Sequence, residues 1–120
     1  MTRLASCVGC LVLTLGCHHA APSQDDLLHG AEEATRSFFA VAEQGDCAQI
    51  KPLMTHPEAC EGMVKEFAET HSHLSSIDTV KVDGRDPQLV LVTVTAQATK
   101  RVHTWIVRVK QTPDGWRVAL

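Results

Sequence analysis

The sequence contains no tyrosine, and three phenylalanines and two tryptophans are its only other aromatic residues apart from histidine. It has no glycine-rich phosphate loop and no nucleophile elbow. Cations are also scarce, because 11 Lys and Arg face 14 Asp and Glu, which gives a formal net charge of −3. Nucleic-acid binding needs an excess of cations to neutralise phosphates, so these numbers argue against nucleic acid as a partner. The 120 residues are enough for one domain with a modest core.

The N-terminal segment has too few apolar residues to cross a membrane. An uncharged apolar run of about a dozen residues follows Arg3, and the chain becomes polar directly after Cys17. A helix needs about 20 apolar residues to span a bilayer, so the run does not predict a transmembrane helix. A positive charge followed by a short apolar run and small residues is typical of a secretory signal. We therefore predict a signal peptide over residues 1–16.

The end of this run, Leu13-Thr14-Leu15-Gly16-Cys17, resembles the lipobox of bacterial lipoproteins. In a lipobox, a small residue precedes a cysteine that is lipidated and becomes the mature N-terminus. The resemblance implies acyl chains such as palmitate on Cys17, a lipidated tether over residues 17–24 and a location in the bacterial cell envelope. Thr14 stands where leucine is usual. The alternative is an ordinary signal that is cleaved after Ala20 or Ala21.

The residue after the predicted lipidated cysteine bears on which membrane is occupied. His18 stands there instead of aspartate. By resemblance to the sorting rule of enteric bacteria, this implies the outer membrane, with the domain facing the periplasm.

The five cysteines divide into groups with different fates. Cys7 and Cys10 fall in the predicted leader and Cys17 takes the lipid, which leaves Cys47 and Cys60. An even remainder in an oxidising compartment predicts a disulfide. The alternative is two separate buried thiols, since free cysteine is also commonly buried.

Helical signals fill the first half of the predicted domain. Ser23 and Asp26 form a variant of the capping box, and Gly45 is a natural helix stop. Between them apolar or small residues recur with helical spacing. They are Leu27, Leu28, Ala31, Ala34, Thr35, Phe38, Val41 and Ala42.

Two further helices are expected before the strands. Asp46 can cap a short second helix, although Pro52 disfavours its continuation. The segment from Thr55 to Glu58 reads as a capping box with a proline at the first helical position, which predicts a third helix. One face of that helix carries Cys60, Met63, Val64, Phe67 and His71.

After about residue 72 the apolar period changes from helical to alternating. One strand ends at the turn Asp83-Gly84, and residues 88–99 form the next strand. A hairpin turn at Lys100 and Arg101 leads to a third strand, and the turn at residues 112–115 leads to a fourth. One face of the second strand carries Val90, Val92, Val94, Ala96 and Ala98, and one face of the third carries His103, Trp105, Val107 and Val109. The pattern predicts an α+β fold with three N-terminal helices packed on a curved antiparallel sheet of about four strands.

Two segments resemble the cone-shaped superfamily named for nuclear transport factor 2. Residues 34–46, with Phe38-Phe39 followed by Gly45-Asp46, are similar to its helical opening, and Asp114-Gly115-Trp116-Arg117-Val118 is similar to its last strand. The resemblance implies that residues 25–120 form a nuclear transport factor 2-like (SnoaL-like, cystatin-like) cone. Small bacterial lipoproteins of uncharacterised function are among its branches. The fold does not specify the function, because similar cones include enzymes and proteins without catalytic activity.

Histidines are the strongest candidates for chemistry. His71, His73 and His103 could form a three-histidine zinc site, although that spacing is common by chance, and we predict neither a metal nor a cofactor. His103 could act as a general base inside an apolar cavity, with Asp78 or Asp83 as its partner. The alternative is a structural histidine at the rim of the sheet. We predict no catalytic residue.

The expected pocket inside the cone carries His103, Trp105, Phe38 and Phe67. The leading hypothesis is a non-enzymatic envelope lipoprotein that binds a small apolar ligand or a protein partner, and that holds the membrane through its N-terminal lipid. The alternative is a cone-pocket isomerase or hydrolase with His103 as general base. A third option, an inhibitor or immunity-type protein, would need a large exposed apolar patch.

Overall fold

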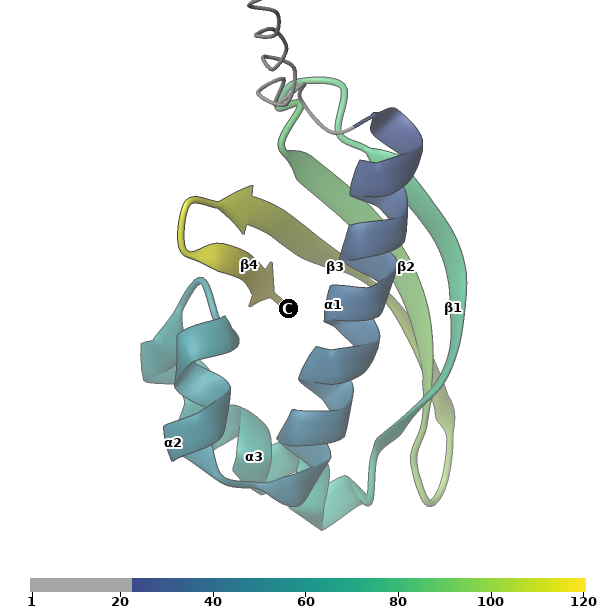
Figure 1. The fold of residues 1–120 in the computed structure, drawn as a ribbon. Helices are drawn as coiled ribbons and strands as arrows, with labels where there is room; N and C mark the ends of the chain where they lie inside the picture. Colours follow the sequence, from purple (N-terminus) through teal and green to yellow (C-terminus); the bar gives the residue numbers. More distant parts are fainter. Residues whose placement is uncertain (1–22) are drawn as a thin grey trace, which may run out of the picture.

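The computed structural model describes residues 23–120, which form an α+β fold (Figure 1). The predicted signal peptide, Cys17 and most of the predicted tether lie outside these residues. The helical elements are α1 (Gln24–Gln44), α2 (Cys47–Ile50), η2 (Lys51–Leu53), η3 (Pro57–Ala59) and α3 (Cys60–Thr70). The strands are β1 (His73–Val82), β2 (Leu89–Gln97), β3 (Val102–Thr112) and β4 (Gly115–Ala119).

Both ends of α1 follow the local signals in the sequence. The Ser23 hydroxyl accepts a hydrogen bond from the backbone N–H of Asp26, at 3.1 Å, and satisfies one of the free donors of the first turn. At the other end Gly45 takes a left-handed conformation, with φ of 77°. The helix buries one face, made of Ala31, Thr35, Phe38, Phe39 and Ala42. The predicted start and stop of this helix are confirmed. Ala31, Thr35, Phe38 and Ala42 were predicted on its apolar face and are buried, whereas the burial of Phe39 was not predicted.

The segment between α1 and α3 consists of one short α-helix, α2, and two 3-10 helices, η2 and η3. The Asp46 side chain caps α2 by accepting from the N–H of Ala48, as predicted. The chain then continues as the 3-10 helix η2, which has Pro52 at its start. The predicted capping box that starts at Thr55 is wrong: Pro57 begins the separate 3-10 helix η3, and α3 starts only at Cys60, without a side-chain cap. The three-residue turn shifts the start of α3 beyond the reach of the Thr55 hydroxyl.

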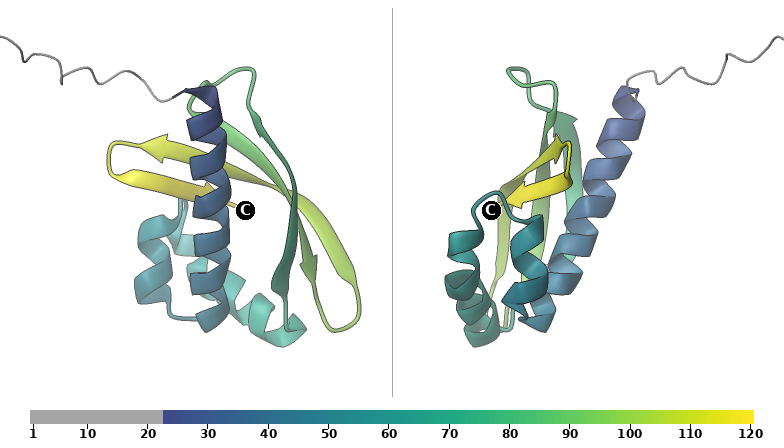
Figure 2. Two further views of the ribbon diagram at one scale, coloured as in Figure 1. Left: turned by 45° about the vertical axis from the view of Figure 1, so that its right-hand side comes forward. Right: turned by 60° about the vertical axis from the view of Figure 1, so that its left-hand side comes forward.

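The sheet is an antiparallel meander of four strands in the order β1-β2-β3-β4. β2 and β3 pair without interruption, from Leu89 opposite Lys110 to Gln97 opposite Val102. Figure 2 shows α1 running along the sheet, with α2 and α3 gathered near the end of α1 that is remote from its start. α1 contacts all four strands.

The edge strands depart from simple alternation. β1 has register shifts against β2 between Leu74 and Ser76 and between Ile77 and Thr79. These irregularities add residues to β1, so its half-buried side chains recur at uneven intervals. β4, at the other edge, is partly covered because the N–H of Thr55 donates to the carbonyl of Val118 at 2.9 Å.

The core lies between α1 and the inner face of the sheet. The valines predicted to alternate on one side of each strand, Val90, Val92 and Val94 of β2 and Val107 and Val109 of β3, are fully buried there. Ile50, Met54, Cys60 and Met63 extend the core toward α2 and α3. Because β3 alternates, His103 and Trp105 lie on the same inner face as the buried valines.

Candidate functional site

A hollow of about 580 Å³ lies between α3 and the N-terminal half of β3. Its apolar lining comes from Ala59, Gly62, Met63, Phe67, Trp105 and Leu120. Its polar lining comes from Glu58, Glu66, Thr70, Ser72, Arg101 and His103. The hollow therefore combines an apolar floor with a polar rim that carries charges of both signs.

Aromatic rings form the wall between this hollow and the core. The Phe39 ring, which is buried, stacks on Phe67 with a centroid separation of 6.1 Å and an interplanar angle of 10°. It also lies 6.1 Å from the Trp105 ring, tilted by 54°. Phe67 and Trp105 are only half-buried, so each presents one side to the core and the other to the hollow. Packing against Phe39 fixes the position of both rings.

Three of the four residues expected in the pocket line this hollow: His103, Trp105 and Phe67. Phe38 does not, because it is 1% exposed and belongs to the core. Adjacent residues of an α-helix point about 100° apart, so only one of the two phenylalanines of α1 can face α3 and β3. Phe39 is that residue, and the two rings meet edge to face at 5.7 Å.

His103 reaches the hollow without either of the partners suggested for it. It lies opposite Ala96, whereas Asp83 lies near the other end of β2 and accepts from the backbone N–H of Arg85. Asp78 accepts a hydrogen bond from the hydroxyl of Thr95. Thr95 faces outward, because its neighbour Ala96 is buried and successive side chains of a strand point to opposite faces. The suggested pairing of His103 with Asp78 or Asp83 is not found within residues 23–120, because strand alternation and register place these carboxylates elsewhere.

Asp78 is instead part of a polar cluster on the outer face of the sheet. Hydrogen bonds from the hydroxyls of Thr95 and then Ser76 favour its ionised form and hold the pKa of Asp78 below its usual value. The carboxyl is exposed, and it belongs to the surface of the sheet, away from the hollow.

The three histidines considered as a zinc site do not share one hollow. His71 ends α3 in a left-handed conformation, with φ of 53°, and with His73 it lines a hollow of about 400 Å³ near Gly45. His103 does not line that hollow. Within residues 23–120, no three His, Cys, Asp or Glu side chains are grouped closely enough to hold a metal ion.

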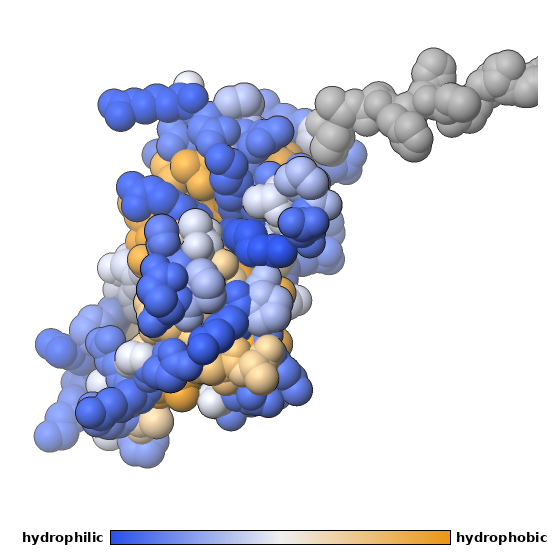
Figure 3. All heavy atoms as spheres, turned by 90° about the vertical axis from the view of Figure 1, so that its left-hand side faces the viewer, coloured by the Kyte–Doolittle hydropathy of each residue, from blue (hydrophilic) through white to orange (hydrophobic). Residues whose placement is uncertain are grey.

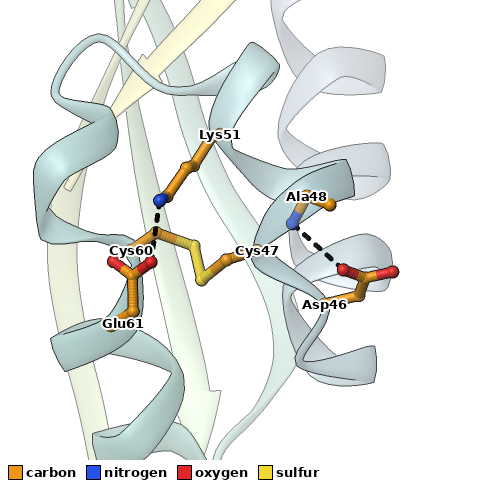
Figure 4. Close-up of a disulfide and its surroundings, with 6 residues drawn as sticks. All are labelled: Asp46, Cys47, Ala48, Lys51, Cys60 and Glu61. Atoms are coloured by element: carbon orange, nitrogen blue, oxygen red, sulfur yellow. Dashed lines mark hydrogen bonds and ion pairs between the residues drawn. A yellow bond between two sulfur atoms is a disulfide. The ribbon is translucent and has the colours of Figure 1, made fainter.

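The predicted disulfide is present and joins the start of α2 to the start of α3 (Figure 4). The Cα atoms of Cys47 and Cys60 are 6.0 Å apart, and Cys60 is fully buried. Beside the bridge the Lys51 ammonium lies 2.7 Å from the Glu61 carboxylate. The hydrogen bond from Lys51 lowers the pKa of Glu61, which is exposed. The bridge fixes the position of α3, and therefore one wall of the hollow.

Apolar surface outside the hollow is scattered. On the side drawn in Figure 3, apolar side chains reach the surface in small areas separated by polar ones. Among residues 23–120 the large apolar side chains that are most exposed are Val102, Ile106 and Leu120. The first two lie four residues apart on the outer face of β3, and Leu120 borders the hollow. These three side chains do not form one broad patch of the kind that the inhibitor or immunity hypothesis requires.

Sequence reasoning missed several residues of the hollow, including Glu66, Arg101 and Leu120. A signal for Arg101 was present, since positions 101, 103 and 105 alternate and share one side of a strand. Glu66 lies on the predicted third helix, but only the packing of α3 against β3 shows that it borders a hollow.

No helix in residues 23–120 is long and apolar enough to cross a membrane.

The described residues define a class, an α+β protein whose helices and antiparallel sheet enclose a partly apolar hollow. Comparisons with protein-family models, with curated proteins and with solved structures return no match. The function is therefore proposed from the geometry of the hollow and from the sequence.

Proposed function

We propose that this chain is a non-enzymatic lipoprotein of the bacterial cell envelope, with a nuclear transport factor 2-like cone that binds a small, mainly apolar molecule between α3 and β3. A lipid on Cys17 holds it to the membrane, and the domain faces the periplasm from the outer membrane. The order of the elements, helices first and an antiparallel meander after them, supports the cone assignment.

The observation that carries the binding function is the hollow itself. Its volume of about 580 Å³ is within the roughly 300 to 1,000 Å³ that small-molecule sites occupy. Phe67 and Trp105 provide rigid apolar surface, because Phe39 packs behind both rings. Six of its twelve lining residues are polar or charged, and these groups can orient a ligand.

The position of the hollow is compatible with an anchored protein. Gln24, the first residue of α1, is seven positions after Cys17. Seven extended residues reach at most about 25 Å, so the start of α1 would stay close to the bilayer. α1 is 21 residues long, or roughly 32 Å, and α3 lies near its far end (Figure 1). The hollow would therefore take its ligand from the aqueous compartment.

Binding can be tested with the neutral apolar dye N-phenyl-1-naphthylamine, whose fluorescence rises in apolar sites. A Cβ at Gly62 would meet no atom within 4 Å, so Gly62→Leu should fold and fill part of the hollow. We expect this variant to bind the dye at least tenfold more weakly. Ala40→Leu, at an exposed position of α1 that lines no hollow described above, adds the same side chain and should bind like the parent. Equal affinity of both variants and the parent would contradict the proposed site.

The alternative, a cone-pocket isomerase or hydrolase, has one observation in its favour, the position of His103 at the hollow. A general base of this kind is usually oriented by a second group. The histidines that form ion pairs within residues 23–120 are His29 and His56, so no carboxylate in that range pairs with His103. We therefore expect no turnover. Turnover of a small substrate that His103→Ala abolishes while the fold persists would establish the enzyme instead.

The anchor is tested independently of the hollow. We expect the parent chain to fractionate with membranes and to incorporate a labelled fatty acid. Cys17→Ser should appear in the soluble fraction without label, whereas Cys10→Ser should behave like the parent. A labelled, membrane-bound Cys17→Ser product would refute lipidation at this residue.

A further inference from the structure

The hollow between α3 and β3 shares lining residues with a second, neighbouring hollow. The second hollow has a volume of about 430 Å³ and lies at the β2–β3 turn. Its lining residues are Glu69, Thr70, His71, Ala98, Thr99, Lys100, Arg101 and His103. Thr70, Arg101 and His103 line both hollows, so these three residues form the junction between them.

The junction favours a negative group. It contains the guanidinium of Arg101, the imidazole of His103 and the hydroxyl of Thr70, and it contains no carboxylate. The lining carboxylates each border only one hollow: Glu58 and Glu66 the first, and Glu69 the second. The ion pairs of lysine and arginine within residues 23–120 involve Arg36, Lys51 and Lys110, so the cations of the β2–β3 turn have no carboxylate within 4.0 Å there. The Arg101 guanidinium is therefore available, and its fork of N–H groups matches a carboxylate.

The opposite wall limits the charge of that group. Glu58, Glu66 and Glu69 line the two hollows from the side of η3 and α3, against the cations Lys100 and Arg101. Three carboxylates against two permanent cations leave the two linings together slightly negative, so an anion is favoured only at the junction itself, beside Arg101 and His103. A dianion such as a phosphate monoester would be repelled more strongly than a monocarboxylate.

A gradient of polarity along β3 orients the ligand. His103 and Trp105 are at alternate positions of β3, about 6.8 Å apart, and Arg101 lies at the end of the β2–β3 turn, directly before the strand begins at Val102. The row begins with a charged side chain and ends with an indole, beside which lie Met63 and Phe67 from α3. Two such steps give about 14 Å from Arg101 to Trp105, a length comparable to that of a medium-length acyl chain such as decanoate.

We propose that the hollow binds an amphipathic monocarboxylate, with its carboxylate at Arg101 and His103 and its hydrocarbon chain on Trp105, Phe67 and Met63. This inference rests on the proposed binding function and adds the chemical class of the ligand.

The test compares decanoate, 1-decanol and decylamine as competitors of N-phenyl-1-naphthylamine on the full chain. These ligands share one hydrocarbon chain and differ in the head group. We expect decanoate to displace the dye at a concentration at least tenfold lower than decanol. Arg101→Gln should reduce this ratio to less than threefold and leave decanol unchanged. Arg108→Gln, which removes the same charge from the outer face of β3, should keep the parent ratio.

The outcomes separate this inference from the function on which it rests. Equal displacement by all three ligands would overturn the carboxylate assignment and leave an apolar binding site. Stronger displacement by decylamine would also overturn it and identify the glutamates as the recognition groups. If the dye does not bind, the proposed site fails its own test, and calorimetric titration with decanoate decides the inference: heat of binding that Arg101→Gln abolishes supports it, and absence of binding refutes it.

Discussion

Removing the disulfide should destabilise the domain more than any other single chemical change described for this chain. The Cys47–Cys60 bridge closes a loop between residues 13 positions apart. That loop contains α2, η2 and η3, which are too short to be stable alone. Its buried side chains, Ile50 and Met54, belong to the core, so loosening the loop also weakens core packing.

The magnitude follows from the size of the loop. Closing a loop of this length lowers the entropy of the unfolded chain by an amount worth roughly 3 kcal/mol at 25 °C. This corresponds to a change of roughly 150-fold in the unfolding equilibrium. For a domain of about 100 residues, 1 kcal/mol shifts the melting temperature by about 4 to 5 °C, so the expected loss is about 12 to 15 °C.

The assay is thermal unfolding followed by far-ultraviolet circular dichroism, in a chain whose other cysteines, Cys7, Cys10 and Cys17, are serine. Cys47→Ala/Cys60→Ala should melt about 12 to 15 °C below the oxidised parent, and the reduced parent should melt close to the variant. Lys51→Gln is the local control, because it removes only the exposed ion pair with Glu61 and should leave the midpoint within error of the parent. A double-alanine variant as stable as the oxidised parent would refute the reasoning.

Three further predictions concern stability. Gly30→Ala should destabilise α1, because a Cβ there would lie 2.7 Å from the Trp116 ring, even though alanine favours helices by about 1 kcal/mol over glycine. Gly62→Ala should stabilise α3 by up to about 1 kcal/mol in urea unfolding, because its new Cβ would meet no atom within 4 Å. Both shifts having the same sign would contradict this. His71→Gly should raise the urea midpoint, because glycine adopts the left-handed conformation of His71 without the steric penalty of about 1 kcal/mol that other residues meet; a lower midpoint would show that the imidazole makes compensating contacts. The lowered pKa of Asp78 contributes stability above the ordinary pKa of aspartate, and this contribution disappears as the pH falls through the lower pKa of the folded state. Asp78→Asn should therefore have a lower urea midpoint at neutral pH and match the parent at acid pH; a constant difference across the pH series would contradict the linkage.

Local features were predictable wherever the physical cause is local. Ser23 and Gly45 mark the ends of α1 because capping and left-handed termination involve only the adjacent turn. The alternation in residues 88–99 predicts the buried valines of β2, since successive side chains of a strand point to opposite faces. The disulfide was predictable from an even number of cysteines after the leader is set aside, and it is present.

Other features depended on tertiary packing. The choice of Phe39 rather than Phe38 as the ring behind the hollow depends on how α1 rotates against α3 and β3, which the helical period alone leaves open. The register shifts in β1 likewise depend on its pairing with β2, which the apolar pattern of β1 alone leaves open.

The sequence by itself determined that helices precede an antiparallel meander and that the valines of β2 are buried, because these follow from periods and turns within short windows. Only the tertiary structure brought Glu66 of α3 to the hollow that Arg101 and Trp105 border. It also placed Asp78 on the outer face of the sheet, away from His103. The physical reason is that a hollow forms where two elements fail to fill the space between them, and that depends on the volumes and rotations of side chains far apart in the chain.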